Sequence, residues 1–277
     1  MSARGGPSAE RSSGSIRKTV VVTGASSGIG RALALAFARR GEVVVLSARK
    51  QEPLSTLARE VEAVGGAPLV HAGDVTREDE RASLVDAAVK QTGRIDVLVN
   101  SAGRGYYGSV ARIDVSELEA LFALNVVAPL RLSQLSIDPL TRTGGSIVML
   151  SSVAGVIASP RMGAYAASKF ALEALSMALR AELGGAGIRV VVVRPGPVDT
   201  PFRAHAITTD GSAGVRPAGA RVQTPEEVAE QTVRAVDSGT AVVETTSFVR
   251  LVSFAARLSP SAVRWVTSAM AARGGHA

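Results

Sequence analysis

The stretch TVVVTGASSGIG, residues 19–30, decides the fold class of this 277-residue chain. Its opening run Thr19–Val22 is rich in β-branched residues, which is typical of a short strand buried on both faces. Glycines then allow a sharp turn, and Ile29, Leu33 and Phe37 follow at helical spacing. A strand, a glycine-rich turn and a helix in this order leave free backbone N–H groups where a pyrophosphate can bind. The stretch therefore predicts a dinucleotide-binding loop, although a tight turn without a ligand fits the same pattern; the predicted contacts are Gly24, Ser26, Ser27, Gly28, Ile29 and Gly30.

Six further short apolar runs alternate with amphipathic segments along the chain. They are Val43–Ser47, Leu69–Ala72, Val97–Asn100, Ile147–Leu150, Val190–Val193 and Ala241–Val243. Repeated strand–helix alternation implies right-handed crossovers and parallel strands. We therefore predict an α/β fold with a single doubly wound parallel sheet of the Rossmann type, about seven strands flanked by helices, and strands buried on both faces.

The two ends of the chain differ from this pattern. Residues 1–18 are rich in Ser, Gly and Arg, which predicts a disordered basic arm before a catalytic and dinucleotide-binding domain over 19–245. Thr224-Pro225 begins a helix, and Ser259-Pro260 resembles a second helix start within a C-terminal amphipathic helical extension, 246–277. That extension fits a cover for the sheet edge or a subunit contact; the alternatives are a lid over an apolar substrate and a membrane-surface helix.

Composition excludes several classes of protein. The chain has no cysteine and three histidines far apart in sequence, so we expect neither disulfides nor a metal site. Of the net charge of +7, +3 lies in residues 1–18 and +3 in residues 242–277, which argues against a nucleic-acid partner. No uninterrupted apolar run reaches about 18 residues, and the N-terminus lacks the apolar core of a signal peptide. We expect a cytoplasmic protein.

The end of the second predicted strand bears on the choice of cofactor. A site that prefers NAD carries an acid about 20 residues beyond the glycine loop, which binds the ribose 2′-hydroxyl. Here Ala48 occupies that position and is followed by Arg49 and Lys50. Because a guanidinium binds a 2′-phosphate with two charge-assisted hydrogen bonds, we predict NADP(H) in preference to NAD(H), with Arg49 as the contact. The alternative is a solvated arginine on a loop.

The residues that carry chemistry begin with Tyr165 and Lys169, which head an apolar helical pattern. Four residues apart, the phenol and the ammonium share one helix face. A cation is what a phenol needs to act as an acid or base near neutrality. With three Tyr and four Lys in the chain, such a pair is expected about 0.04 times by chance. Ser152 follows a strand end, where its hydroxyl can reach the ligand crevice.

Asn125 lies in an apolar helical stretch four residues before Pro129. Proline has no N–H, so the Asn125 carbonyl loses its usual helical partner. A kink would leave this carbonyl free to hold a water molecule. A residue that merely caps or bends the helix fits as well.

From Thr19 to Thr200 the chain resembles the short-chain dehydrogenase/reductase family. The resemblance rests on the glycine loop, the Asp74-Val75 step, Asn100-Ser101-Ala102-Gly103, Asn125, Ser152, Tyr165-x-x-x-Lys169 and Pro195-Gly196-Pro197-Val198-Asp199-Thr200. It implies a catalytic tetrad of Asn125, Ser152, Tyr165 and Lys169, with adenine contact near Asp74 and carboxamide contact at Val198 and Thr200. The full set of implied cofactor contacts beyond the glycine loop and Arg49 is Asp74, Val75, Asn100, Ala102, Gly103, Tyr165, Lys169, Pro195, Gly196, Val198 and Thr200.

The expected activity is hydride transfer between NADP(H) and a carbonyl or secondary alcohol. Ser152 would bind the substrate carbonyl and Tyr165 would give it a proton, its pKa lowered by Lys169 and by the nicotinamide charge. Lys169 would also hold the nicotinamide ribose. Tyr106, Met162 and Phe202 hint at an apolar substrate, and residues 201–222 are expected to form its lid.

Other classes remain open at this stage. They are a non-catalytic NADP(H)-binding sensor or scaffold, a reductase held at a membrane surface by residues 247–272, and an epimerase or dehydratase of the extended branch. We expect a small-molecule carbonyl or alcohol substrate and a homo-oligomer. The substrate itself and the direction of the reaction are not predicted.

Overall fold

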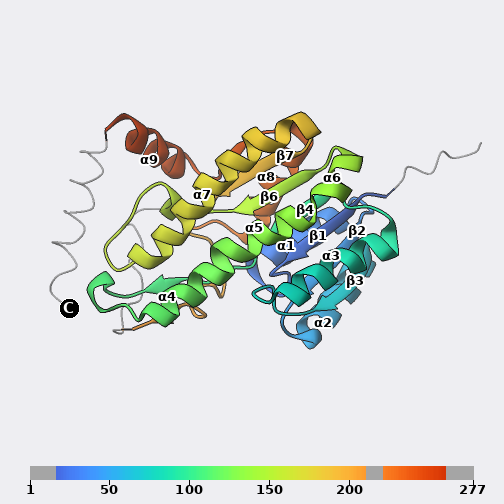
Figure 1. Ribbon diagram of the computed structural model, residues 1–277, viewed down its shortest axis with the longest axis horizontal. Coiled ribbons are helices and arrows are strands. Elements are labelled where there is room, and N and C mark those ends of the chain that lie inside the picture. Colours follow the sequence, from blue (N-terminus) through green and yellow to red (C-terminus); the bar gives the residue numbers. More distant parts are fainter. Residues whose placement is uncertain (1–16, 210–220, 260–277) are drawn as a thin grey trace, which may run out of the picture.

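A seven-stranded parallel sheet runs through the middle of the molecule in the computed structural model, which describes residues 17–209 and 221–259 (Figure 1). In spatial order its strands are β3 (Ala67–Ala72), β2 (Val43–Ala48), β1 (Thr19–Thr23), β4 (Val97–Asn100), β6 (Ser146–Leu150), β7 (Arg189–Arg194) and β9 (Val242–Glu244). Chain order reverses between β1 and β4, the switch point of a doubly wound sheet. The predicted fold class is confirmed, and each predicted apolar run coincides with one of these strands, except that Ala241 precedes β9.

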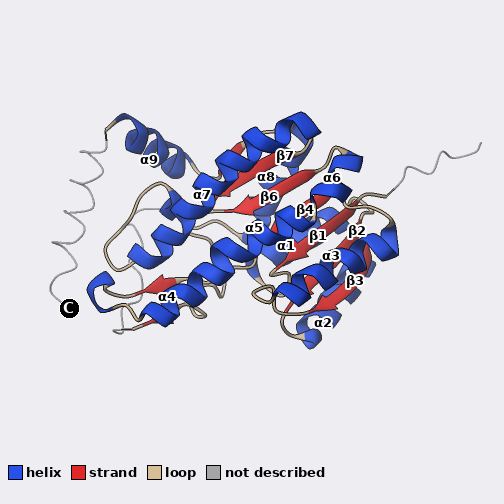
Figure 2. Ribbon diagram, viewed as in Figure 1, coloured by secondary structure: helices blue, strands red, loops and turns tan. Residues whose placement is uncertain are grey.

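Helices cover both faces of the sheet (Figure 2). One layer holds α1 (Gly28–Ala38), α2 (Gln51–Ala63) and α8 (Pro225–Ser238). The opposite layer holds α3 (Glu78–Thr92), α5 (Ala128–Leu135), α6 (Ile137–Thr143) and α7 (Gly163–Leu183). A further helix, α4 (Val115–Phe122), runs into α5 through the π-helical turn η2 (Ala123–Val127). Short 3-10 turns complete the helices: η1 (Val110–Arg112), η3 (Val153–Gly155) and η4 (Gly184–Ala186).

Alternating side chains of the central strands enter two separate cores. Val20 and Val22 pack in the core under α1, whereas Val21 packs in the core under α3 and α5. Because both faces of the central strands are buried, their sequences are continuous apolar runs. The prediction of burial on both faces is wrong for β3, where Val70 is 36% exposed. The reason is its place at the edge of the sheet.

A second, two-stranded parallel sheet joins β5 (Tyr106–Tyr107) to β8 (Ile207–Thr208). It was not predicted, because two-residue strands have no periodicity to read. The pairing brings the segment after β4 against the start of the predicted 201–222 lid. The remainder of that lid, 210–220, lies outside the described residues, as do most of the 1–18 arm and residues 260–277.

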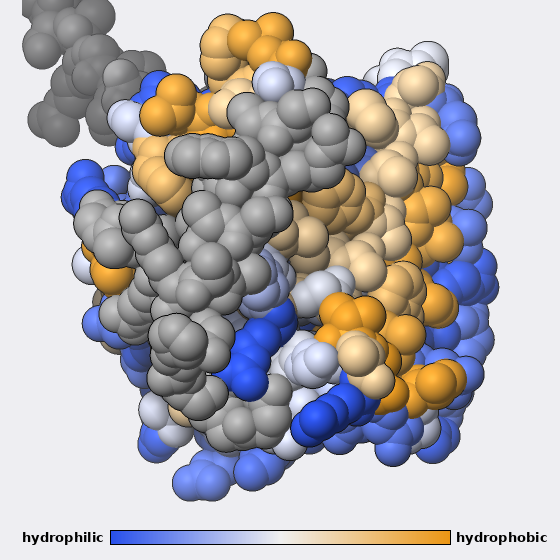
Figure 3. Space-filling view, turned by 90° about the vertical axis from the view of Figure 1, so that its left-hand side faces the viewer, coloured by the Kyte–Doolittle hydropathy of each residue, from blue (hydrophilic) through white to orange (hydrophobic). Residues whose placement is uncertain are grey.

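The C-terminal part confirms one predicted helix start. Thr224 accepts from the Glu227 N–H and the Glu227 side chain accepts from the Thr224 N–H, so a capping box begins α8. The last described helix is α9 (Ser247–Leu258), which exposes 62–68% of its Leu251, Phe254 and Leu258 side chains. Figure 3 shows apolar surface at the top of the molecule, where α9 lies. The predicted helix restart at Ser259-Pro260 falls at the edge of the described residues.

Within the described ranges, no single helix is long and apolar enough to cross a membrane. One bent pair, Val115–Leu135 with Ile137–Thr143, passes that test by length and composition alone.

Thr23 joins β1 to the loop after β4 at the switch point. Its hydroxyl donates to the Val99 carbonyl at 3.2 Å and accepts from the N–H groups of Ser101 and Ala102 at 3.1 and 3.2 Å. The side chain is buried, with 1% of Thr23 exposed. One hydroxyl therefore fixes the two strand ends between which a ligand crevice opens.

Replacing this hydroxyl by a methyl group tests its contribution. Thr23→Val keeps the shape but removes the acceptor of the Ala102 N–H and leaves the Ser101 N–H with the Val99 carbonyl alone. This should lower the free energy of unfolding by about 1–3 kcal/mol. Urea denaturation measures the loss. Thr23→Ser retains the hydroxyl and should cost clearly less; an equal loss in both variants would assign the effect to packing.

Candidate active site

The glycine loop is built by close backbone approach. Gly24 has φ of +65°, and a Cβ there would lie 2.8 Å from the Cα of Ala102. Gly28 has φ of +55°, and a Cβ would lie 3.1 Å from Cγ2 of Thr200. A Cβ on Gly30 would overlap the Gly24 carbonyl. The glycines are therefore required, and they bring the predicted contacts after β4 and β7 to the loop.

The N-terminus of α1 is free to bind a ligand. Ser27 occupies the N-cap position with extended backbone and makes no capping side-chain bond to the first turn. The free N–H groups and the helix dipole both favour an anion there. The residues present fit the pyrophosphate of a dinucleotide.

Asp74 and Arg49 lie near one another beyond the ends of β3 and β2. Burial acts to raise the pKa of Asp74, but hydrogen bonds from the Thr76 N–H and hydroxyl and the charges of Arg49 and Arg77 outweigh it, so the pKa is lowered. The two bonds measure 2.9 and 2.8 Å. Arg49 is exposed, and Val75 is buried. The structure thus places the predicted adenosine-side residues in one neighbourhood.

The residues after β4 lie beside the catalytic candidates. Asn100 is 4% exposed, and its amide nitrogen contacts the Ser133 hydroxyl at 3.4 Å. A Cβ on Gly103 would lie 3.3 Å from Oδ1 of Asn125 and 3.8 Å from Nζ of Lys169. Gly103 therefore gives this loop close access to both side chains.

Asn125 lies in the middle of the π-helical turn η2. The distortion predicted from Pro129 is thus a widened turn, a feature frequent at functional sites. The side chain is buried: Oδ1 accepts from the Arg104 N–H at 2.9 Å, and Nδ2 donates to the Arg104 carbonyl at 2.9 Å and the Ser168 hydroxyl at 3.0 Å. Asn125 thereby ties the loop after β4 to α7.

Tyr165 and Lys169 lie on the buried face of α7, with 6% and 5% exposed. The Lys169 Nζ lies 5.8 Å from the centroid of the Tyr165 ring and donates to the Leu150 carbonyl at 2.7 Å. Ser152 follows β6, accepts from the Ala154 N–H at 3.1 Å, and its hydroxyl is hydrogen-bonded to the Tyr165 phenol. Residues distant in sequence thus meet at the ends of β4 and β6, as predicted.

The electrostatics of the pair differ from the prediction. Burial raises the pKa of Tyr165, the Ser152 bond lowers it less, and the neighbouring Tyr107 phenol adds to the rise. The Lys169 ammonium donates its hydrogen bond to the Leu150 carbonyl. Burial lowers the pKa of Lys169 to about 8, against the opposing charge of Glu173. The contribution of the nicotinamide charge stays a prediction.

The three predicted substrate residues gather beside Tyr165. Tyr106, Met162 and Phe202 belong to one apolar cluster with it, and the Phe202 ring lies 5.7 Å from the Tyr165 ring. The sequence analysis missed Tyr107, which is 6% exposed and has the Arg203 guanidinium 5.6 Å above its ring. No local pattern marks Tyr107, because the two-residue strand that carries it is too short to show a periodicity.

The turn after β7 packs between the site and α9. The Pro195 carbonyl accepts from the Val153 N–H at 3.0 Å, and a Cβ on Gly196 would lie 3.3 Å from Cγ2 of Val249. Val198 pairs with Gln223 through a parallel bridge. These contacts place the predicted nicotinamide-side residues opposite the glycine loop.

Comparison with known proteins identifies the class. The family model for short chain dehydrogenase matches residues 18–211. The chain therefore belongs to the short-chain dehydrogenase/reductase family of oxidoreductases, which act on carbonyl and alcohol groups of small molecules and bind NAD(P).

Individual relatives cover different shares of the chain. It is 39% identical over 224 residues to the glycine betaine reductase ATRR of Emericella nidulans, covering 79% of this chain but only 17% of that relative. It is 33% identical over 259 residues to the ketoacyl reductase HetN of a Nostoc species, covering 90% of this chain and 88% of that protein.

Two solved structures show the same fold. A short-chain dehydrogenase from Streptomyces avermitilis superposes with a TM-score of 0.80 at 28% identity, covering 94% of this chain and 98% of that one. An alcohol dehydrogenase from the archaeon Thermococcus sibiricus, complexed with 5-hydroxy-NADP, gives 0.73 at 29% identity, covering 82% and 94%.

The buried Lys169 predicts a pH-dependent stability. Its pKa is lowered from 10.5 to about 8, so as pH falls from 10 to 8 the unfolded chain takes up the proton first and the folded chain loses stability. Between pH 8 and 10 the free energy of unfolding should therefore rise with pH by about 2 kcal/mol more in the native chain than in Lys169→Met. Above pH 10 the raised pKa of Tyr165 acts in the opposite direction. Equal pH slopes in urea denaturation would contradict a buried, titrating Lys169.

Proposed function

We propose that this protein is an NADP(H)-dependent reductase of carbonyl compounds, which also oxidises secondary alcohols in the reverse direction. The observation that carries the proposal is the convergence of Asn125 from η2, Ser152 from the turn after β6, and Tyr165 and Lys169 from α7 onto one cluster beside Gly103. A chain that only sensed a nucleotide would not need a phenol and an ammonium buried together.

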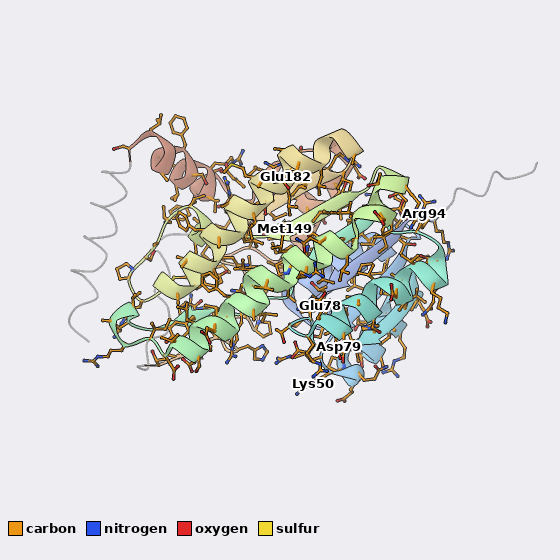
Figure 4. All side chains as sticks on the ribbon, viewed as in Figure 1. Lys50, Glu78, Asp79, Arg94, Met149 and Glu182 are labelled. Carbon is orange, nitrogen blue, oxygen red and sulfur yellow. The ribbon has the colours of Figure 1, made fainter. Side chains whose placement is uncertain are left out.

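The proposed cofactor is held by the glycine loop at the N-terminus of α1 and by the segments that face it. Bound NADPH would supply the hydride. Arg49, without an acid at position 48, supports a preference for the 2′-phosphate, because its guanidinium is exposed and near Asp74. Lys50 follows it at the start of α2, on the lower edge of the molecule in Figure 4. The similar archaeal alcohol dehydrogenase holds an NADP analogue.

Proton transfer is assigned to the Ser152–Tyr165 pair. The Ser152 hydroxyl is bonded to the phenol, so a carbonyl oxygen that reaches both would accept a hydrogen bond from Ser152 and the proton from Tyr165. Because burial raises the pKa of Tyr165, the phenol is held protonated, as an acid in carbonyl reduction must be. Lys169 stands below the ring to stabilise the phenolate left behind.

The proposed substrate is a carbonyl or alcohol with an apolar body. Phe202, Tyr106 and Met162 form an apolar wall next to the Tyr165 ring. We also propose that the chain forms a homo-oligomer, supported by apolar side chains that α7 leaves exposed, Phe170 and Met177.

Removing the phenolic hydroxyl separates catalysis from binding. Tyr165→Phe should reduce turnover of carbonyl substrates by at least about 100-fold, the scale of lost general acid catalysis, because no other group donates the proton. Binding of NADPH, followed by nicotinamide fluorescence, should change little. Loss of NADPH binding in this variant would argue against the role given to Tyr165.

Cofactor choice is tested at Arg49. Arg49→Ala should weaken NADPH binding by about 10- to 100-fold, the worth of charged hydrogen bonds to a phosphate, and leave NADH binding unchanged. Arg59→Ala, an exposed arginine on α2, is the matched control and should affect neither. Weaker binding of both cofactors in Arg49→Ala, or a native preference for NADH, would contradict the assignment.

A further inference from the structure

Behind the catalytic helix, one buried arginine is held between two carboxylates. Arg194 at the end of β7 donates from Nε and Nη2 to the two carboxylate oxygens of Glu173, at 2.9 and 2.8 Å. Its Nη1 donates to Glu244 at the end of β9, at 3.0 Å. The exposed side-chain fractions are 8% for Arg194, 13% for Glu173 and 21% for Glu244. A bidentate pair in this setting fixes the Glu173 carboxylate in place.

The Glu173 side chain lies against the turn that carries Ser152. A Cβ on Gly155, in η3, would lie 2.9 Å from Cγ of Glu173 and 2.7 Å from the Ser151 hydroxyl. Glycine is therefore required at 155 to let the turn approach Glu173. On the other side, Arg194 directly precedes Pro195 and Gly196. Glu173 thus links α7, on which it lies, to the η3 turn and, through Arg194, to the turn after β7.

Glu173 is also the acidic neighbour of Lys169. It follows Lys169 by four residues on α7, so the two side chains share a helix face. The other titratable or charged groups around Lys169 are Tyr165 on α7, Tyr107 on β5 beyond it, and Arg194 on β7 behind Glu173. The segments η3 and η2 bring the uncharged Ser152 and Asn125.

A buried ammonium loses its proton readily unless a counter-charge is fixed nearby. The Leu150 carbonyl gives Lys169 a hydrogen bond but no full charge. Glu173 raises the pKa of Lys169 against the burial that lowers it. Arg194 partly offsets this effect, but it also stops the carboxylate from rotating away.

We propose that Glu173 is a positioning residue that acts through Lys169: fixed by Arg194 and Glu244, its carboxylate keeps the Lys169 ammonium charged beside Tyr165 and supports the Ser152 turn. The importance of this charge for turnover rests on the proposed reductase function. The effect of Glu173 on the charge of Lys169 does not depend on that function.

The test is a direct titration of Lys169 in the full chain. The sequence holds only four lysines, Lys18, Lys50, Lys90 and Lys169, so biosynthetic labelling with ¹³C-lysine gives four Cε signals, and Lys169→Arg assigns the one of interest. In Glu173→Gln we expect the midpoint of the Lys169 titration to fall by about one pH unit, a tenfold change in its protonation equilibrium. No cofactor or substrate is needed.

Two variants separate charge from fold. Glu182→Gln makes the same change on the exposed end of α7 (Figure 4) and should leave the Lys169 titration unchanged. Arg194→Gln removes the clamp but keeps the carboxylate, so any fall of the midpoint should be clearly smaller than in Glu173→Gln. In Glu173→Gln, Arg194 keeps its bond to Glu244. If this variant does not fold by circular dichroism, the triple variant Glu173→Gln with Arg194→Gln and Glu244→Gln leaves no charge of the cluster unpaired and should still show the fall.

The outcomes are distinct. An unchanged Lys169 midpoint in folded Glu173→Gln, or an equal fall in Glu173→Gln and Arg194→Gln, would overturn the proposal in favour of a purely structural ion cluster. A lowered midpoint should be matched by a shift of the alkaline limb of the kcat profile to lower pH. A lowered midpoint in a chain that turns over no carbonyl would contradict the proposed function and leave the electrostatic role of Glu173 intact.

Discussion

The whole site depends on how closely the turn after β1 approaches the loop after β4. Gly24 stands where a side chain would strike the backbone of Ala102, and the Thr23 hydroxyl bridges both strand ends. Because the chain order reverses between these strands, loops from the two halves of the sheet meet at this switch point, where doubly wound folds bind their ligands. The loop after β4 in turn fixes Asn125 through Arg104, and Asn125 fixes α7 through Ser168. A chain of short polar contacts thus runs from the first strand to the helix that carries Tyr165.

Burial governs the chemistry that this framework can support. A phenol that is nearly inaccessible to water holds its proton, and an ammonium in the same surroundings tends to release its own. Burial therefore favours a neutral phenol beside a neutral amine, and neighbouring groups decide how far each side chain becomes charged. Ser152 favours the charged form of the phenol and Glu173 favours the charged form of the ammonium.

The sequence predicted the parts whose signal is local. The seven strands, the glycine loop, the helix start at Thr224 and the Tyr165–Lys169 face all follow from short-range patterns, and the structure places them accordingly. It did not predict the β5–β8 pairing, Tyr107 or the Arg194 ion cluster, because each depends on residues 20 to 100 positions apart whose types are ordinary on their own. The prediction that β3 is buried on both faces was also wrong, since strand order in a sheet is a property of the whole chain. The rise of the Tyr165 pKa was missed for a similar reason, because desolvation comes from packing.

Because Gly196 lies close to Val249, the two sides of α9 tolerate substitution to different degrees. Val249 is fully buried against the turn after β7, while Leu251, Phe254 and Leu258 face outward. Substitutions at Val249 change the packing under the turn after β7, so they are coupled to the site that we propose for the dinucleotide. Those on the outer side are not, and this surface can diverge to meet new surroundings while the same chemistry is retained.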